Sequence, residues 1–262
     1  MKALKPSHSV IGIILFLLIS SVALNVVLYL KAQNFLQDRN FYYLKLSKIL
    51  LDPDPLKLSF YSEKNKQLDL TSSTLPVVVF FGDSRAYHWV LPSNIHGFLL
   101  INRGIGGQTS ADVMDRFAYD IKPLKPNVII LQVGINDLTN IPIFFLQKQI
   151  IIDNCKANIS KIVSESQSIG STVILTTIFP LGRLPHDQMS FWSDVITAIN
   201  DVNDYIRSLG GERVIIFDTT QALADDQGLV KREYSQDVIH LNDSGYRVLN
   251  AELEKVLGRI HL

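Results

Sequence analysis

The chain lacks the features on which several classes of protein depend. It contains a single cysteine, Cys155, in 262 residues, so it can form neither an intrachain disulfide nor a metal site built from several cysteines. It has no excess charge, because 25 lysines and arginines stand against 25 aspartates and glutamates. That balance argues against a nucleic-acid binder that relies on bulk electrostatics. Cys155 falls in an apolar helical pattern, where we expect a buried core residue rather than a nucleophile.

Apolar sequence, in contrast, is abundant. Hydrophobic residues make up 47% of the chain and charged residues 19%, which suits one sizeable domain plus an appendage. From Val10 to Leu30 no residue is charged, and at about 1.5 Å per residue this stretch reaches roughly 30 Å, enough to cross a bilayer. A cleaved signal peptide is the alternative, since Lys2 and Lys5 precede the stretch. It exceeds the roughly 7–15 apolar residues of a signal peptide, however, and no small-x-small site follows it.

We therefore expect an uncleaved, single-pass membrane anchor. Positive residues lie on both sides of it, so charge alone does not fix its orientation. The shortness of the N-terminal tail favours a cytoplasmic tail, with the bulk of the protein outside, in the periplasm or at the cell surface.

Three regions follow from the pattern. Residues 1–31 form the tail and anchor, residues 32–75 form a partly helical stem or linker, and residues 76–262 form the main domain. Apolar residues of the stem recur at roughly helical spacing until Asp52-Pro-Asp-Pro55, which stops that helix.

Strands alternate with helices from Pro76 onward. The strand candidates are continuously apolar and rich in β-branched or aromatic residues, which is typical of parallel strands covered on both faces. They are Val77–Phe81, Phe98–Asn102, Val128–Val133, Thr172–Ile178 and Arg213–Phe217, and the helix candidates are Ala111–Ile121, Phe144–Gln167, Phe191–Leu209 and Gly245–Leu257. Five β-α units predict a three-layer α/β/α domain around a parallel five-stranded sheet of flavodoxin-like order.

Residues able to do chemistry follow the first three predicted strands. Ser84 comes after the first strand. The segment Asn102-Arg-Gly-Ile-Gly-Gly107 begins at the last residue of the second strand, and Gly134-Ile-Asn-Asp137 follows the third. Active sites of open α/β sheets are built at this edge. A serine hydroxyl is a poor nucleophile until a base takes its proton, so Ser84 needs an imidazole within reach.

Asp237 and His240, just before the last helix, are the best partners for that serine. A spacing of three residues in a turn brings a carboxylate beside an imidazole, which holds the proton on Nδ1 and leaves Nε2 facing the serine. Of the other candidate histidines, His88 and His96 have no aspartate at comparable spacing, and His186 lies beside Asp187 in a proline-containing loop.

An oxyanion site is also available. The Asn136 side chain, a backbone N–H of the Gly106-Gly107 pair and the Ser84 amide provide three donors for a tetrahedral intermediate. A turn asparagine and hinge glycines are the ordinary interpretations of these residues, but their placement on consecutive strand ends favours the catalytic one.

The chain resembles the SGNH/GDSL hydrolase family, an esterase, lipase and acylhydrolase superfamily. Four sequence blocks carry the resemblance, in this order: Gly82-Asp-Ser84, Asn102-x-Gly-x-Gly-Gly107, Gly134-x-Asn-Asp137 and Asp237-x-x-His240. The resemblance covers about residues 76–258. It implies the SGNH hydrolase fold, a Ser84 nucleophile, a His240 general base and acid, an Asp237 orienter, and oxyanion donors from Ser84, Gly107 and Asn136. It also implies ester or thioester hydrolysis with neither a metal nor an organic cofactor.

Arg85 departs from the family pattern, because it stands where the family name has leucine. That position is not itself catalytic in the pattern. A buried guanidinium needs partners, so we expect Arg85 either to pair with a carboxylate such as Asp83 or Asp137, or to face the cleft.

The sequence thus predicts a membrane-anchored serine esterase that works through an acyl-enzyme. A small ester, an O-acetylated glycan and a lysophospholipid all remain open as substrates, and no nucleic-acid partner is expected. Two alternatives stay open: an acyltransferase that uses the same residues, and a catalytically inactive, tethered binding protein.

Overall fold

A computed structural model describes residues 8–52, 54–55, 57–68, 70, 73–92, 95, 97–184 and 189–260. The chain divides into two compact units, Met1–Pro55 and Leu56–Leu262. Each unit is described by itself. Two of the histidines considered above, His96 and His186, lie outside the described residues.

The first unit contains one long helix, α1, from His8 to Leu51. Its stretch Ile11–Gln33 has a mean hydropathy of 2.7 and is long and apolar enough to cross a membrane. The apolar side chains of this stretch are exposed within the chain itself. The helix ends one residue before the Asp52-Pro-Asp-Pro55 sequence, as predicted, but it runs without a break from the anchor segment through the helical part of the stem.

The second unit is built on a parallel five-stranded sheet of order β2-β1-β3-β4-β5. The predicted α/β fold with flavodoxin-like strand order is therefore confirmed. Each strand begins within one residue of its predicted start. The strands are β1 Val77–Gly82, β2 Leu99–Gly104, β3 Val128–Gln132, β4 Thr172–Thr176 and β5 Val214–Phe217.

The strand β4 is two residues shorter than predicted, because at Ile178 a side chain takes the backbone hydrogen bonds that a neighbouring strand would otherwise make. The amide of Ile178 donates to Asn203 Oδ1 at 2.7 Å, and Asn203 Nδ2 donates to the carbonyl of Ile178 at 3.0 Å. The apolar pattern continues to Ile178, but its backbone groups bond to a buried asparagine of a helix instead of to a neighbouring strand.

Helices fill the connections between strands. The predicted helix Ala111–Ile121 is divided at Arg116, whose fully buried guanidinium donates to Gln108 Oε1, Asp120 Oδ2 and the carbonyl of Gly82. The helices are α2 Ser62–Gln67, α3 Ser84–Tyr87, α4 Ser110–Asp115, α5 Phe117–Asp120, η1 Lys122–Leu124, α6 Ile135–Leu138, η2 Phe145–Gln147, α7 Lys148–Ser168, α8 Met189–Ser208, α9 Thr220–Leu223, η4 Arg232–Tyr234 and α10 Asp243–Leu257. Asn242 caps α10 by accepting from the amides of Ser244 and Gly245.

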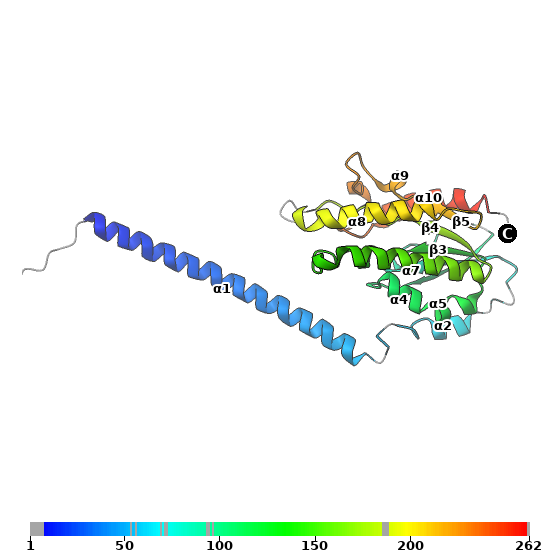
Figure 1. The fold of residues 1–262 in the computed structure, drawn as a ribbon, viewed down its shortest axis with the longest axis horizontal. Helices are drawn as coiled ribbons and strands as arrows, with labels where there is room; N and C mark the ends of the chain where they lie inside the picture. The colour runs from blue at the N-terminus through cyan, green and yellow to red at the C-terminus, as the bar shows by residue number, and fades with distance from the viewer. Residues whose placement is uncertain are drawn as a thin grey trace, which may run out of the picture. The chain divides into compact units, whose positions relative to one another are not determined.

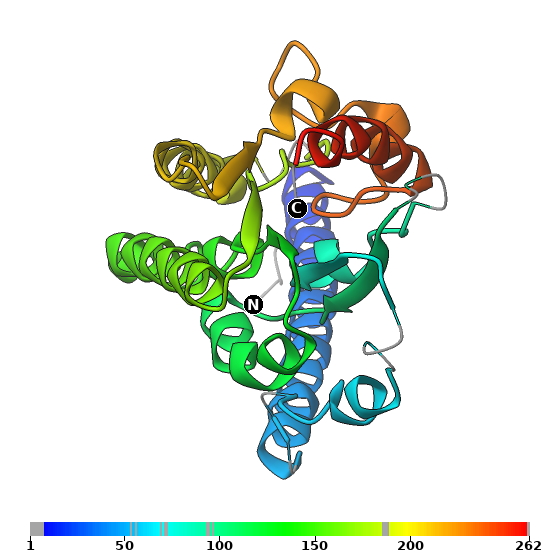
Figure 2. The ribbon, with the colours of Figure 1, turned by 90° about the vertical axis from the view of Figure 1, so that its right-hand side faces the viewer.

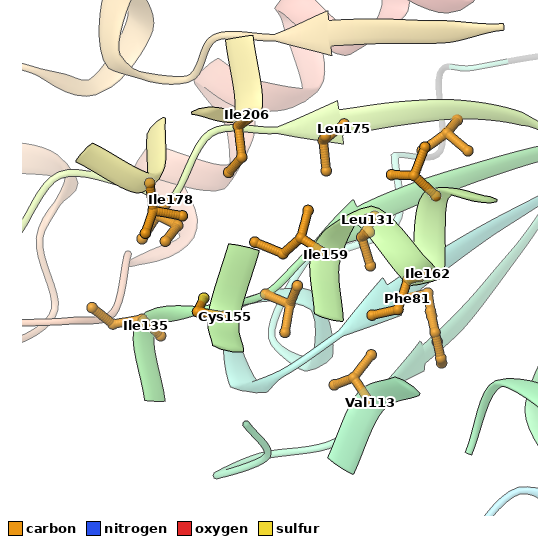
Figure 3. Close-up of a cluster of buried hydrophobic side chains, with 14 of the residues drawn as sticks. Phe81, Val113, Leu131, Ile135, Cys155, Ile159, Ile162, Leu175, Ile178 and Ile206 are labelled. Carbon is orange, nitrogen blue, oxygen red and sulfur yellow. The ribbon is translucent and has the colours of Figure 1, made fainter. Parts of the chain in front are cut away.

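Two apolar cores lie on opposite faces of the sheet, as expected for three layers. Alternate β1 residues point to each face: Val79 and Phe81 join the core beneath α4, α7 and α8, whereas Val78 and Phe80 join the core beneath α10. Figure 2 shows these helices on the two sides of the sheet, and Figure 3 shows the first core from within. Cys155 is fully buried in this first core, and burial raises its thiol pKa well above the usual value.

Residues just before the sheet also pack on this unit. The Tyr61 hydroxyl donates to the carbonyl of Gly104 at 2.5 Å, and Asn65 Oδ1 accepts from Arg103 Nε at 2.8 Å. The Arg103 guanidinium lies 4.6 Å from the centre of the Tyr61 ring. The end of β2, which leads into one of the candidate catalytic loops, is therefore supported by residues that precede β1.

Candidate active site

The candidate nucleophile lies in the turn between β1 and α3. Asp83 caps α3, with its Oδ1 accepting from the Arg85 amide at 2.8 Å, and Ser84 is the first residue of the helix. Gly82 has φ +151°, and a Cβ there would lie 1.7 Å from the carbonyl oxygen of Gln132. The turn therefore requires glycine, because β3 passes directly against it. Ser84 itself is 7% exposed.

Three of the predicted site residues form a hydrogen-bonded series. Ser84 Oγ lies 3.0 Å from His240 Nε2, and His240 Nδ1 lies 2.8 Å from Asp237 Oδ2. The other carboxylate oxygen, Asp237 Oδ1, accepts from the amides of Ile239 and His240, each at 2.8 Å. The turn before α10 thus holds the carboxylate against both the imidazole and its own backbone. This is the arrangement in which an imidazole can take a proton from a serine hydroxyl.

The charge on Asp237 is stabilised in this turn. Its partial burial favours the neutral acid, but the hydrogen bonds from His240 and from the amides of Ile239 and His240 outweigh burial and lower its pKa. The carboxylate is therefore available to accept a hydrogen bond from Nδ1–H. The ring of His88, one of the rival histidines, lies edge-on to His240 with 5.7 Å between ring centres.

The loop after β2 passes directly beside the nucleophile. A Cβ built on Gly106 would lie 3.8 Å from the Cβ of Ser84. Gly107 adopts φ +79°, which disfavours any residue with a side chain. The loop that carries the glycine pair therefore lies against Ser84 at Gly106.

Asn136 is tied to this loop from the third strand. It follows Gly134, which has φ +117°, and its Nδ2 donates to the carbonyl of Gln108 at 2.9 Å. An amide nitrogen carries two hydrogens, so this bond fixes the orientation of the side chain and leaves a second N–H for another acceptor. The structure therefore links Asn136 to the residue that follows Gly107.

Asp137 has a structural role that the sequence reasoning did not assign. Its Oδ2 accepts from the Ser110 amide at 2.8 Å and its Oδ1 accepts from the Ser110 hydroxyl at 2.6 Å. Burial raises the pKa of this carboxyl, although the bonds from Ser110 oppose the shift. Asp137 thereby fastens the start of α4 to α6. The sequence signal available for this role was the position of Asp137 directly after Asn136, in the segment Gly134-Ile-Asn-Asp137.

Both predictions for Arg85 are wrong. The side chain is fully buried, so it does not face the cleft, and within the described part of the chain no carboxylate accepts from its guanidinium. Nε instead donates to the carbonyl of Ile239 at 2.8 Å and Nη1 to the carbonyl of Phe179 at 3.0 Å. The guanidinium carbon also lies 5.1 Å from the centre of the Phe179 ring. Carbonyl oxygens of two loops accept from Nε and Nη1 where a carboxylate was expected, whereas the buried Nη2 has no hydrogen-bond partner among the described residues.

The charges of Arg85 and Asp83 nevertheless influence each other. Burial lowers the pKa of Arg85 to about 10, with Asp83 opposing the shift, so the guanidinium stays charged at neutral pH. Burial likewise raises the pKa of Asp83 to about 6, with Arg85 opposing it. The two residues therefore support each other's charge without a direct side-chain hydrogen bond.

Replacing Arg85 by leucine should cost about 2–4 kcal/mol of the free energy of unfolding, because two buried carbonyls lose a charged donor. It should also lower kcat, since the carbonyl of Ile239 belongs to the residue before His240. Urea unfolding and steady-state kinetics measure the two effects. Arg207→Leu is the matched control, because it removes two partly exposed ion pairs, with Asp204 and Asp218, and should cost less than about 1 kcal/mol. An equal loss in both variants would contradict this role for Arg85.

The fold, with the serine–histidine–aspartate series at the carboxyl edge of the sheet, fits one class of enzyme, the ester hydrolases. The chain belongs to the GDSL-like Lipase/Acylhydrolase family, whose profile matches residues 77–248. An acetylxylan esterase of Geobacillus stearothermophilus is 24% identical over 167 residues, which cover 62% of this chain and 73% of that protein.

Solved structures share the fold. A GDSL-like lipase from Bacteroides thetaiotaomicron superposes with a TM-score of 0.61 at 20% identity, covering 78% of this chain and 98% of that one. The acetylxylan esterase Axe2 from Geobacillus stearothermophilus superposes with a TM-score of 0.55 at 18% identity, covering 71% of this chain and 95% of that one. Membership of the GDSL-like Lipase/Acylhydrolase family identifies the chain as a hydrolase of ester bonds.

Proposed function

We propose that this protein is a membrane-anchored serine esterase that removes small acyl groups through an acyl-enzyme. The observation that carries the proposal is the 3.0 Å contact between Ser84 Oγ and His240 Nε2, with Asp237 on the opposite ring nitrogen. A hydroxyl in that position can lose its proton to the imidazole as it attacks an ester carbonyl.

The reaction proceeds in two balanced halves. Ser84 Oγ bonds to the carbonyl carbon while His240 takes its proton, and His240 then gives that proton to the departing alcohol as the ester C–O bond breaks. Water next attacks the acyl-enzyme, losing its proton to His240, and the carboxylic acid leaves as Ser84 recovers its proton. Asp237 keeps the ring oriented throughout.

Three N–H donors stabilise the negative oxygen of each tetrahedral intermediate in this scheme. They are the amides of Ser84 and Gly107 and the second N–H of Asn136. Donors fixed before the reaction are effective because they need little reorganisation when charge develops. The bond from Asn136 to Gln108 and the tight approach of the Gly106 loop support this assignment.

An acetylated glycan is the substrate class best supported by the known relatives. One of them is named an acetylxylan esterase, and acetyl is a small acyl group on a sugar hydroxyl. A lysophospholipid is the competing substrate, because the proposed anchor would keep the enzyme at a lipid surface.

The anchor is tested by fractionation of the full-length chain. If Ile11–Gln33 spans the bilayer, the protein should remain in membranes after carbonate extraction and keep its N-terminal peptide, as mass spectrometry of the purified protein would reveal. A chain that begins at residue 57 should be recovered in the soluble fraction. Recovery of a processed chain without the apolar segment would instead identify that segment as a cleaved signal.

A further inference from the structure

Helices α4 and α7 lie side by side (Figure 1). A groove of about 530 Å³ is lined by residues of α7, the start of α4 and α6, a volume within the usual range of small-ligand sites. One wall comes from the start of α4 and from α6 with the turn after it. The other wall comes from one face of α7 and the segment before it. The lining residues are Thr109, Ala111, Asp137, Asn140, Phe144, Gln147, Ile151, Asn154 and Asn158.

Two residues of the groove lining are close in sequence to the proposed oxyanion donors. Thr109 stands two residues after Gly107, and Asp137 directly follows Asn136. The side chain of Asn140 donates to the carbonyl of Asn136 at 2.8 Å. A ligand that occupied this groove would therefore contact Thr109, two residues after Gly107, and Asp137, which directly follows Asn136.

The lining is polar but carries little charge. Four of its nine residues have neutral amide side chains, and none is lysine or arginine. Asp137 is the one acidic residue of the lining, and both of its carboxylate oxygens accept from Ser110. The amide side chains of Gln147 and Asn154 have no hydrogen-bond partner among the described residues, so their donors and acceptors are available to a ligand.

We propose that this groove binds the sugar rings of an O-acetylated oligosaccharide whose acetyl ester lies at Ser84. Each sugar hydroxyl both donates and accepts a hydrogen bond, as each amide side chain does. Phe144, which is 51% exposed, offers an aromatic ring on which the apolar face of a pyranose can pack. The inference rests on the proposed esterase function, since the ester must be cleaved at Ser84.

A lysophospholipid fits this lining less well. Its phosphate would favour an arginine or a lysine, and the groove has neither. Its acyl chain would need a continuous apolar surface, whereas the apolar lining is limited to Ala111, Phe144 and Ile151. The strongly exposed side chains of Ile143, Phe145 and Leu146 do not line the groove.

The test compares substrates on the purified full-length protein. The probes are xylotriose, cellotriose and chitotriose that each carry one acetyl ester, together with p-nitrophenyl acetate and lysophosphatidylcholine. We expect at least one acetylated trisaccharide to be hydrolysed with a higher kcat/KM than lysophosphatidylcholine.

In the double variant Gln147→Ala, Asn154→Ala, the ratio of kcat/KM for that trisaccharide to kcat/KM for p-nitrophenyl acetate should fall on the order of tenfold, mainly through KM. Phe144→Ala should lower the same ratio on the order of fivefold.

Gln149→Ala is the matched control. Gln149 is an exposed amide of α7 that bonds to Asp153 and does not line the groove, so the ratio should stay within twofold. Hydrolysis of p-nitrophenyl acetate without hydrolysis of any trisaccharide, preference for lysophosphatidylcholine, or an unchanged ratio in the groove variants would each overturn the groove assignment while the esterase stands. Failure to hydrolyse every ester would instead overturn the proposed function.

Discussion

Ser84→Ala should lower kcat for p-nitrophenyl acetate on the order of 10⁵–10⁶-fold, because the substitution removes the atom to which the acyl group bonds. The fold should be unaffected. The Ser84 hydroxyl has one described hydrogen bond, to His240, and no buried group depends on it. Steady-state kinetics measures the loss, and thermal unfolding of the same preparation checks the fold.

Ser168→Ala provides the comparison for this variant. Among the described residues its hydroxyl bonds to the carbonyl of Glu165 alone, at the surface end of α7, so kcat should stay within twofold of the unmodified protein. A Ser84→Ala protein that kept more than about one per cent of the activity would show that another group is the nucleophile.

Asp237→Asn should lower kcat on the order of 10³–10⁴-fold, although the volume of the side chain hardly changes. Asparagine can still accept from the amides of Ile239 and His240 through its oxygen, so the turn should persist. Its NH2 group, however, would donate to His240 Nδ1 and move the ring proton to Nε2. The imidazole could then no longer accept the proton of Ser84.

A control variant distinguishes loss of the correct imidazole tautomer from the mere loss of a negative charge near the site. Asp243→Asn changes an exposed aspartate at the start of α10, a few residues away, and should leave kcat within twofold. A loss of less than about tenfold in Asp237→Asn would mean that the imidazole does not need this carboxylate.

The strands and the nucleophile turn could be predicted because their signals are local. Continuous apolar runs such as Val77–Phe81 have few alternatives to a buried parallel strand. The three-residue spacing of Asp237 and His240 likewise specifies a turn that brings their side chains together, and the structure brings them within 2.8 Å. A sequence pattern is therefore sufficient to predict a contact when the contacting residues are close together in the sequence.

Contacts between distant segments could not be predicted in the same way. The guanidinium of Arg85 bonds to the carbonyl of Ile239, 154 residues away, and backbone carbonyls leave no signature in the sequence. For the same reason the pattern missed the division of a helix at Arg116, whose side chain reaches back to Gly82. A long charged side chain shows that it needs partners but not where those partners come from.

The groove also could not be predicted from the sequence, because its walls come from three separate segments. Thr109 caps α4, Asn140 follows α6, and Asn154 lies on α7. Each is an ordinary polar residue in its own segment. These residues line one polar groove only because α4 and α6 pack against α7.

Covalent labelling by a phosphonate ester tests the central claim most directly, because attack on phosphorus requires an activated hydroxyl and leaves a stable mimic of the tetrahedral intermediate. Mass spectrometry should find one label on the intact protein, located at Ser84, and none on Ser84→Ala. The label should form quickly at neutral pH and slowly in Asp237→Asn, where the base is misoriented. Absence of label on the unmodified protein at every pH from about 6 to 9, or a label on any residue other than Ser84, would contradict the account.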